Sequence, residues 1–536
     1  IWCCNIALFP WNQVEYNNNE IDELSSVVAY PAILPSSFSG NKILEGSTLD
    51  FTNATIGFFE NNTFQSSSLT MIQGFVGTFS QNQVLNSTSI NCDDILGSGV
   101  ISDNIFADRS TINLNTLTLD IGLGSKSIFT NEIYETTINA QGGVIGRMVR
   151  NFLQNSNFRI VNAIIDNIAG NTGFSASSLR FDGSTISQLK NNNVLSDCTL
   201  RATDCNINTV NDNHVSSGSS IVILNSQMIE LTANEVTGFS EIEVSDSAFI
   251  ADIKQNRLTN NSKIDYASSA SNYCEWNDIS SFSFIQITGN LQSSIILDNK
   301  LDNASDITLY NTSGTPVIER NQLSQNSMFD FANGVNVQVV RENTLTQGSL
   351  IQFADTSGVN TLSYNTLIDN SFLNLLNGST IDSFVHNNIS GSTLPFNDSI
   401  LTSYANNSIV NTTNTYTTLT LGSFDNNESS SSTINLQFSN ISQITYNVLK
   451  QQSTLLYSST DGIATTNNEL NSASINLNFN ILTGVNVQYN SLSQSSNLTI
   501  QNATDLGAVT YNNLINNSQI NIDGFSNASM VVEYNV

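Results

Sequence analysis

Side chains that could do acid–base or metal chemistry are scarce in this sequence. The only two histidines are His214, which follows an asparagine, and His386, which precedes one. The sequence contains no zinc-type Cys/His spacing, phosphate-binding loop or nucleophile elbow. The glycine-rich segment at 122–127 lacks the spacing of a phosphate loop, so we interpret it as a surface loop. We therefore predict a protein that is not an enzyme, with no catalytic residue, no metal and no cofactor.

One group of charged residues is regularly spaced. Arg180 and Arg201 each lie nine residues after a repeated asparagine, and Arg159 takes the same position with an offset of one residue. In later repeats this position holds Val222, Glu243 and Asp265. We expect these side chains to form one outward column, with the arginines and the two acids as the candidate contact to a partner or a glycan.

Two interpretations of this column stay open. Strands about 4.8 Å apart would bring Glu243 and Asp265 near the ~5 Å carboxyl separation of retaining glycosidases, which suggests chemistry on a polysaccharide. The arginines could equally bind an anionic glycan or a partner subunit. Alternatively, outward positions only need to be polar, and complementary charges along a column avoid repulsion.

The spacing of asparagine predicts the elements that position these residues. From Asn19 to Asn535 an asparagine recurs in 24 steps with a mean of 21.5 residues, and only the step from Asn104 to Asn131 is long, at 27. A fixed period of this size is typical of a stacked solenoid. The clearest members are Asn256, Asn277, Asn299, Asn321, Asn343, Asn365 and Asn387.

Apolar residues recur in phase with these asparagines. They lie three residues before and two residues after each one, and again at eight and ten residues after, as at Ile307 and Leu309. Alternation with a period of two indicates short strands with one buried face. Each repeat therefore predicts a coil of about three strands. About 25 such coils, stacked as parallel strands, would form a rod on the order of 120 Å long.

The repeated asparagine has a physical explanation. Asparagine tolerates the left-handed backbone of a corner, and its amide both donates and accepts hydrogen bonds. Stacked asparagines can therefore bond to the coils on either side and satisfy buried polar groups. A serine six residues later, as at Ser305 and Ser327, is expected to act similarly at a second corner.

In these repeats the chain resembles the right-handed parallel β-helix superfamily, which includes pectate lyases, phage tail spikes and surface adhesins. The resemblance covers nearly the whole chain and rests on coils of about 22 residues with an inward asparagine ladder. The resemblance implies an all-β fold that consists of a single parallel β-helix. Proteins with this fold include enzymes, receptor binders and inert rods.

Composition limits the partners. The net charge is −29 with only 16 Lys and Arg, which argues against nucleic acid and anionic membranes. No apolar run reaches the ~20 residues needed to cross a bilayer. Among the six cysteines, Cys198 falls in the serine column and reads as a small buried substitute, whereas pairing with Cys205 would require the chain to turn back.

We expect residues 1–40 to form an irregular N-terminal cap or docking segment, and residues 41–536 to form the β-helix with a loop insertion at 117–130. Because the repeat runs to Val536, we expect either more chain or stacking on another subunit. The predicted function is a non-enzymatic extracellular structural or adhesive fibre of a cell-surface appendage or virion tail, whose partners are copies of itself or other fibre subunits. The alternative is a polysaccharide-binding or polysaccharide-degrading β-helix.

Overall fold

The structure is a computed structural model. It describes residues 5–8, 16–29, 32–33, 37–73, 75–93, 96–97, 100–119, 128–245, 252–267, 273–290, 295–354, 358–376, 378–396, 399–417, 420–437, 440–459, 464–479, 485–502, 506–523 and 531–533. The chain divides into two compact units, unit 1 (Ile1–Ser269) and unit 2 (Ala270–Val536). Across the described residues, the regular elements are all β-strands and none is a helix.

Each coil consists of three short strands and three tight corners. In unit 1, Asn192 is followed by β28 (Asn193–Leu195), β29 (Thr199–Thr203) and β30 (Asn206–Asn211), and the next coil begins at Asn213. The corners between these strands use left-handed residues with positive φ, namely Ser196, Asp197, Asp204 and Asp212. The predicted three-strand coil is confirmed.

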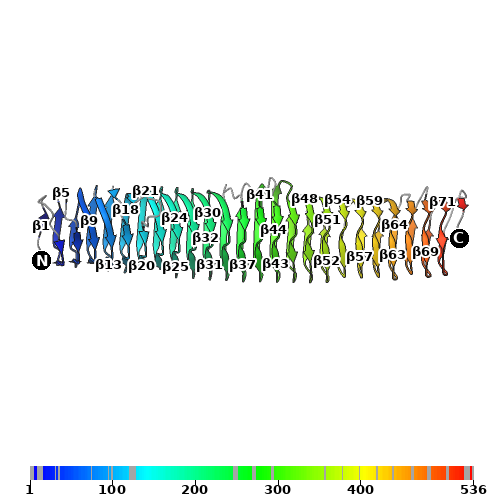
Figure 1. Ribbon diagram of the computed structural model, residues 1–536, viewed down its shortest axis with the longest axis horizontal. Coiled ribbons are helices and arrows are strands. Elements are labelled where there is room, and N and C mark those ends of the chain that lie inside the picture. The colour runs from blue at the N-terminus through cyan, green and yellow to red at the C-terminus, as the bar shows by residue number, and fades with distance from the viewer. Residues whose placement is uncertain are drawn as a thin grey trace. The chain divides into compact units, whose positions relative to one another are not determined.

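Successive coils pair in parallel and in register. In unit 1, β28 lies between β25 (Thr172–Phe174) and β31 (His214–Ser216). In unit 2, β52 (Thr366–Ile368) lies in the same way between β49 (Thr344–Leu345) and β55 (Asn388–Ser390). Figure 1 shows the strands of successive coils side by side within each unit. Within these paired strands, each side chain therefore lies beside its equivalents in the adjacent coils.

Stacked apolar side chains fill the interior of each unit. Positions eight and ten residues after the asparagine alternate with outward polar positions, and inward residues such as Ile307 and Leu309 are fully buried. Aromatic rings also stack along the interior. Phe59 of unit 1 stacks on Phe38 and Phe79 with ring centroids 4.9 and 5.2 Å apart. Burial of these columns is the main source of stability.

The repeated asparagines form a hydrogen-bonded ladder inside each unit. The amide nitrogen Nδ2 of Asn192 donates to Oδ1 of Asn213 and to the carbonyl oxygen of Ile168, both at 3.0 Å. Its Oδ1 accepts bonds from the backbone N–H and the amide of Asn171, at 3.1 and 2.9 Å. We call these residues the ladder asparagines. They run through unit 1 to Asn256 and continue in unit 2 through Asn277, Asn299, Asn321, Asn343, Asn365 and Asn387 to Asn512.

The expectation that the asparagines themselves adopt the left-handed conformation was wrong. Positive φ belongs to the residue before each ladder asparagine, such as Asn191 (52°) and Tyr364 (56°). The ladder asparagine must aim its side chain inward to reach the next amide. The preceding residue turns the chain instead, and its side chain is partly or fully exposed, so this position accepts residues as different as Trp276 and His386.

Serine columns line the other two corners, as predicted for one of them. The backbone N–H of Ser305 donates to Oγ of Ser327 at 3.3 Å, and Oγ of Ser327 donates to the carbonyl of Ser324 at 2.7 Å. Cys198 and Cys205 replace serine at these two corners in one coil and are buried, free thiols. They therefore form no disulfide, while Cys3 and Cys4 lie outside the described residues.

The two expected irregular segments are only partly described. Within residues 1–40, β1 (Asn5–Leu8) pairs with β4 (Ser26–Ala29), and β3 (Glu20–Ile21) pairs with β7 (Lys42–Ile43), in the same parallel register as later coils. At 117–130, the ends belong to β18 (Thr111–Leu119) and β19 (Ile128–Phe129), and residues 120–127 lie outside the described part. The cap and the insertion stay predictions.

These observations establish the fold. The chain is all-β and forms a parallel β-helix of about 20 turns with a ladder of stacked asparagine side chains.

Candidate functional site

The charged residues singled out by their spacing form one outward column in unit 1. They lie on β23 (Asn157–Val161), β26 (Ser178–Asp182), β29, β32 (Ser220–Leu224), β35 (Glu241–Ser245) and β38 (Lys263–Ala267). We call this set the charged column. In register, from coil to coil, it consists of Arg159, Arg180, Arg201, Val222, Glu243 and Asp265. The predicted placement is confirmed, and a role in binding stays a prediction.

Two of the three arginines share one carboxylate. Nε of Arg159 and Nε of Arg180 each donate to Asp182, to Oδ2 and Oδ1 respectively, both at 2.9 Å. Nε of Arg201 donates to Oγ1 of Thr203 at 3.3 Å. Among the described residues, Asp182 is the only carboxylate paired with these arginines. This part of the column therefore carries excess positive charge on a strongly acidic protein.

The opposite end of the column is acidic. Glu243 and Asp265 lie directly opposite each other on β35 and β38. Nζ of Lys263 lies 2.9 Å from Oε2 of Glu241 and 3.8 Å from Oδ2 of Asp265. The hydrogen bond to Glu241 is the main reason that the pKa of Lys263 is raised, so this lysine stays protonated. Three carboxylates and one ammonium leave this end with negative charge.

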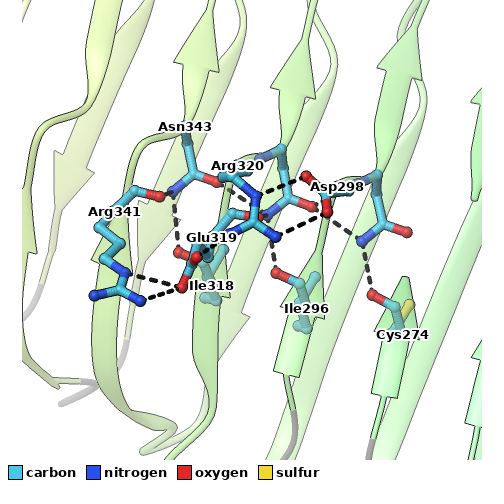
Figure 2. Close-up of polar contacts among 10 residues, drawn as sticks. Cys274, Ile296, Asp298, Ile318, Glu319, Arg320, Arg341 and Asn343 are labelled. Atoms are coloured by element: carbon cyan, nitrogen blue, oxygen red, sulfur yellow. Dashed lines mark hydrogen bonds and ion pairs between the residues drawn. The ribbon is translucent and has the colours of Figure 1, made fainter. Parts of the chain in front are cut away.

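A second charged cluster lies beside the ladder in unit 2, and the sequence patterns did not reveal it. Figure 2 shows Arg320 and Arg341 both turned toward Glu319, whose side chain is almost buried. Nε and Nη2 of Arg341 donate to Oε2 of Glu319 at 2.8 and 2.6 Å. Arg320 pairs with Glu319 and also holds Asp298 with two bonds of 3.0 Å. The sequence could have revealed this cluster through its position, because all four residues lie one or two residues before a ladder asparagine.

These ion pairs join strands of neighbouring coils and balance one another in charge. The hydrogen bonds to Asp298 are the main reason that the pKa of Arg320 is raised further. The donors of both arginines are aimed at carboxylates of the same chain. We therefore assign this cluster to coil-to-coil packing.

One carboxyl group is held in an unusual environment. Asp306 on β44 (Asp306–Ser313) lies between Phe284 and Met328 in the adjacent strands. Burial, and secondarily the charge of Asp330, raise the pKa of Asp306 to about 6. An apolar setting favours the neutral carboxyl, which explains the direction of the change. A raised carboxyl pKa can mark a functional acid, yet no other titratable group but Asp330 acts on it.

The remaining candidates for chemistry are the two histidines, which have different neighbours. Nδ1 of His214 lies 3.1 Å from Glu235, which also pairs with Arg257 at 3.3 Å. His386 stacks on Tyr364 with ring centroids 4.9 Å apart. In the described ranges, no three His, Cys, Asp or Glu side chains are grouped so that they could hold a metal ion.

No protein family and no curated protein matches the chain. In the part of the chain that the structure describes, no helix is long and apolar enough to cross a membrane.

Proposed function

We propose that this protein is a non-enzymatic structural or adhesive fibre protein of an extracellular filament, appendage or virion tail. The observation that carries the proposal is the ladder, in which each amide bonds to the coils before and after it within each unit. Such repeated bonding fixes the spacing between coils and resists bending. At the described corners, one or two residues with positive φ turn the chain from one strand to the next.

Surface chemistry supports the same proposal. Several charged side chains pair with the adjacent coil, as in Lys450 with Glu428 at 2.9 Å and Arg320 with Asp298. Pairs of this type brace neighbouring strands rather than converge on a substrate. Within the β-helix fold, we further propose a right-handed coil and kinship with the superfamily of tail spikes, surface adhesins and pectate lyases.

Electron microscopy of the full chain and of native material would test this function. We expect thin fibres, or rods fixed end to end in a larger appendage. Particles that stay single at all concentrations, and that are absent from any appendage, would contradict the proposal.

A second candidate function is binding or cleavage of a polysaccharide, and the charged column favours it. Arg159, Arg180 and Arg201 present positive charge beside two adjacent carboxylates. Binding of anionic and neutral glycans by the wild type and by Arg180→Ala/Arg201→Ala tests the binding role. Loss of glycan cleavage in Glu243→Gln or Asp265→Asn would establish the enzymatic one. Unchanged binding and assembly in the arginine double variant would remove the binding role, and unchanged cleavage in the two carboxylate variants would remove the enzymatic one.

A further inference from the structure

The order of charges in the charged column is unfavourable within a single chain. Arg159 lies opposite Arg180, which lies opposite Arg201, and Glu243 lies opposite Asp265. Like charges directly opposite one another destabilise a sheet, whereas alternating signs would stabilise it. The segregation of three arginines from two acids therefore calls for an explanation outside the isolated coil stack.

The face that carries this column is suited to contact with another flat face. Small side chains flank the arginines, including Ser178, Thr199 and Thr203. Between the basic and acidic ends, β32 presents the outward Val222 and Leu224, both only partly buried. An apolar centre with opposite charges on its two sides is a self-complementary arrangement.

We propose that this face binds the same face of a second copy of the chain in antiparallel orientation. The two-fold axis would run along β32, so that Val222 and Leu224 of both copies meet at the centre. Arg201 then faces Glu243 of the second copy, one coil from the axis. Arg180 faces Asp265 of the second copy, two coils from the axis. Symmetry repeats each contact, which gives four ion pairs, as an isologous interface requires.

Geometry and charge agree with this arrangement. Both copies have the same spacing of about 4.8 Å between coils, so the contacts stay in step along the column. Sheets pack about 10 Å apart, a gap that an arginine and a carboxylate side chain can bridge together. The basic end has three arginines and Asp182, and the acidic end has three carboxylates and Lys263, so their net charges cancel. A parallel arrangement would instead set arginine against arginine.

This inference rests on the proposed fibre function, because it names the surface through which copies associate side by side. Failure of this inference can be distinguished from failure of the fibre function, since fibres held by other contacts would still appear in the microscope. Conversely, dimers through this face could form in a protein that makes no fibre.

The test is sedimentation equilibrium of the full chain and its charge-reversal variants at low and high salt. We expect the wild type to form dimers that weaken as salt rises. Arg180→Glu/Arg201→Glu makes the four positions that face each other across the interface (180, 201, 243 and 265) acidic, and Glu243→Arg/Asp265→Arg makes the same four positions basic. Each should raise the dimer dissociation constant at least about 100-fold, because like charges then face each other.

The decisive measurement mixes the two variants. The four acidic positions of one chain then face the four basic positions of the other, so the mixture should restore dimers that neither variant forms alone. The control Lys42→Glu/Lys450→Glu matches the charge change of the acidic variant at exposed positions outside the column and should dimerise normally. Circular dichroism confirms that each variant is folded.

Three outcomes would overturn the proposal. The wild type could be monomeric at every salt concentration, the reversals could leave dimers intact, or the mixture could stay monomeric. The wild type could instead be monomeric and bind a sulfated polysaccharide. If Arg180→Glu/Arg201→Glu abolished that binding, the arginines would be assigned to an anionic glycan.

Discussion

Each ladder asparagine is held by bonds that other side chains cannot reproduce. Asn321 accepts from the backbone N–H and the amide of Asn299 at 2.9 and 3.0 Å, and it donates to Asn343 and to the carbonyl of Ile296. Leucine has a similar size but no polar atom, and aspartate would place an unpaired charge in the interior. The residue type is therefore set by hydrogen bonding and not by the turn.

Asn321→Leu should destabilise the protein by about 3–5 kcal/mol, because the backbone N–H and one side-chain N–H of Asn299 lose their buried acceptor. Chemical denaturation followed by circular dichroism would measure the loss. The control is Asn336→Leu at an exposed position of β48 (Asn336–Arg341), which should change stability by less than about 0.5 kcal/mol. Equal effects of the two substitutions would contradict the assigned role of the ladder.

The raised pKa of Asp306 predicts a dependence of stability on pH. With a folded pKa of about 6 and an unfolded value of 3.8, the folded state binds the extra proton between these values. Stability contributed by this group therefore falls as pH rises from about 4 to 6, and the cost remains above pH 6.

Asp306→Asn should thus stabilise the protein by about 1 kcal/mol at pH 7, with little difference below pH 4. This figure allows for solvent screening of a carboxyl that is only partly buried. Thermal unfolding between pH 4 and 8 is the measurement, with the exposed Asp382→Asn on β54 (Thr380–Val385) as the charge-matched control. A stabilisation that is constant with pH would show that the carboxyl does not titrate as stated.

At the scale of the elements, much of the coil could be predicted from the sequence. The alternation at positions such as Ile307 and Leu309 predicts the strands because one face of each is buried. The left-handed residue could not be predicted, because its side chain points to solvent and varies freely. The cluster around Glu319 was missed for a related reason, since its charges alternate between neighbouring positions and follow no single column.

The interior of unit 1 contains a packing defect that sequence patterns do not reveal. A cavity of about 50 Å³ lies among Met71, Phe79, Cys92 and Ile112. It adjoins Asn131, the end of the single long repeat. Apolar residues at the expected positions therefore do not guarantee close packing when one coil departs from the common length.

Cys92→Val on β14 (Ser89–Asp93) should fill part of this cavity and stabilise the protein by about 0.5–1 kcal/mol. The matched control is Cys274→Val on β39 (Tyr273–Glu275), where the thiol is also buried but accepts a bond from Asn277 at 3.5 Å. That substitution should be neutral or destabilising. Thermal unfolding of both variants would test the difference, and a stabilised Cys274→Val with an unchanged Cys92→Val would contradict it.

At the scale of the whole molecule, stability should be local, because each coil contacts chiefly the coils before and after it. In a solenoid, the free energy is approximately a sum of coil terms and nearest-neighbour terms. A broken ladder bond should therefore weaken adjacent coils and leave distant ones intact. Electrostatic repulsion, in contrast, is not local, since a net charge of −29 acts over the whole surface at low salt.

Hydrogen exchange of Asn192→Leu tests this locality. Amides of β27 (Thr185–Lys190), β28, β30 and β31 should lose protection, because Asn171 and Asn213 both lose their partner at the ladder. Amides of β11 (Ser68–Ile72) in the same unit should exchange as in the wild type. Asn206→Leu, exposed in the same coil, is the control and should leave the protection of the coil unchanged. Uniform loss across unit 1 would instead show that its coils unfold as one cooperative block, so that a single ladder defect would weaken the entire unit.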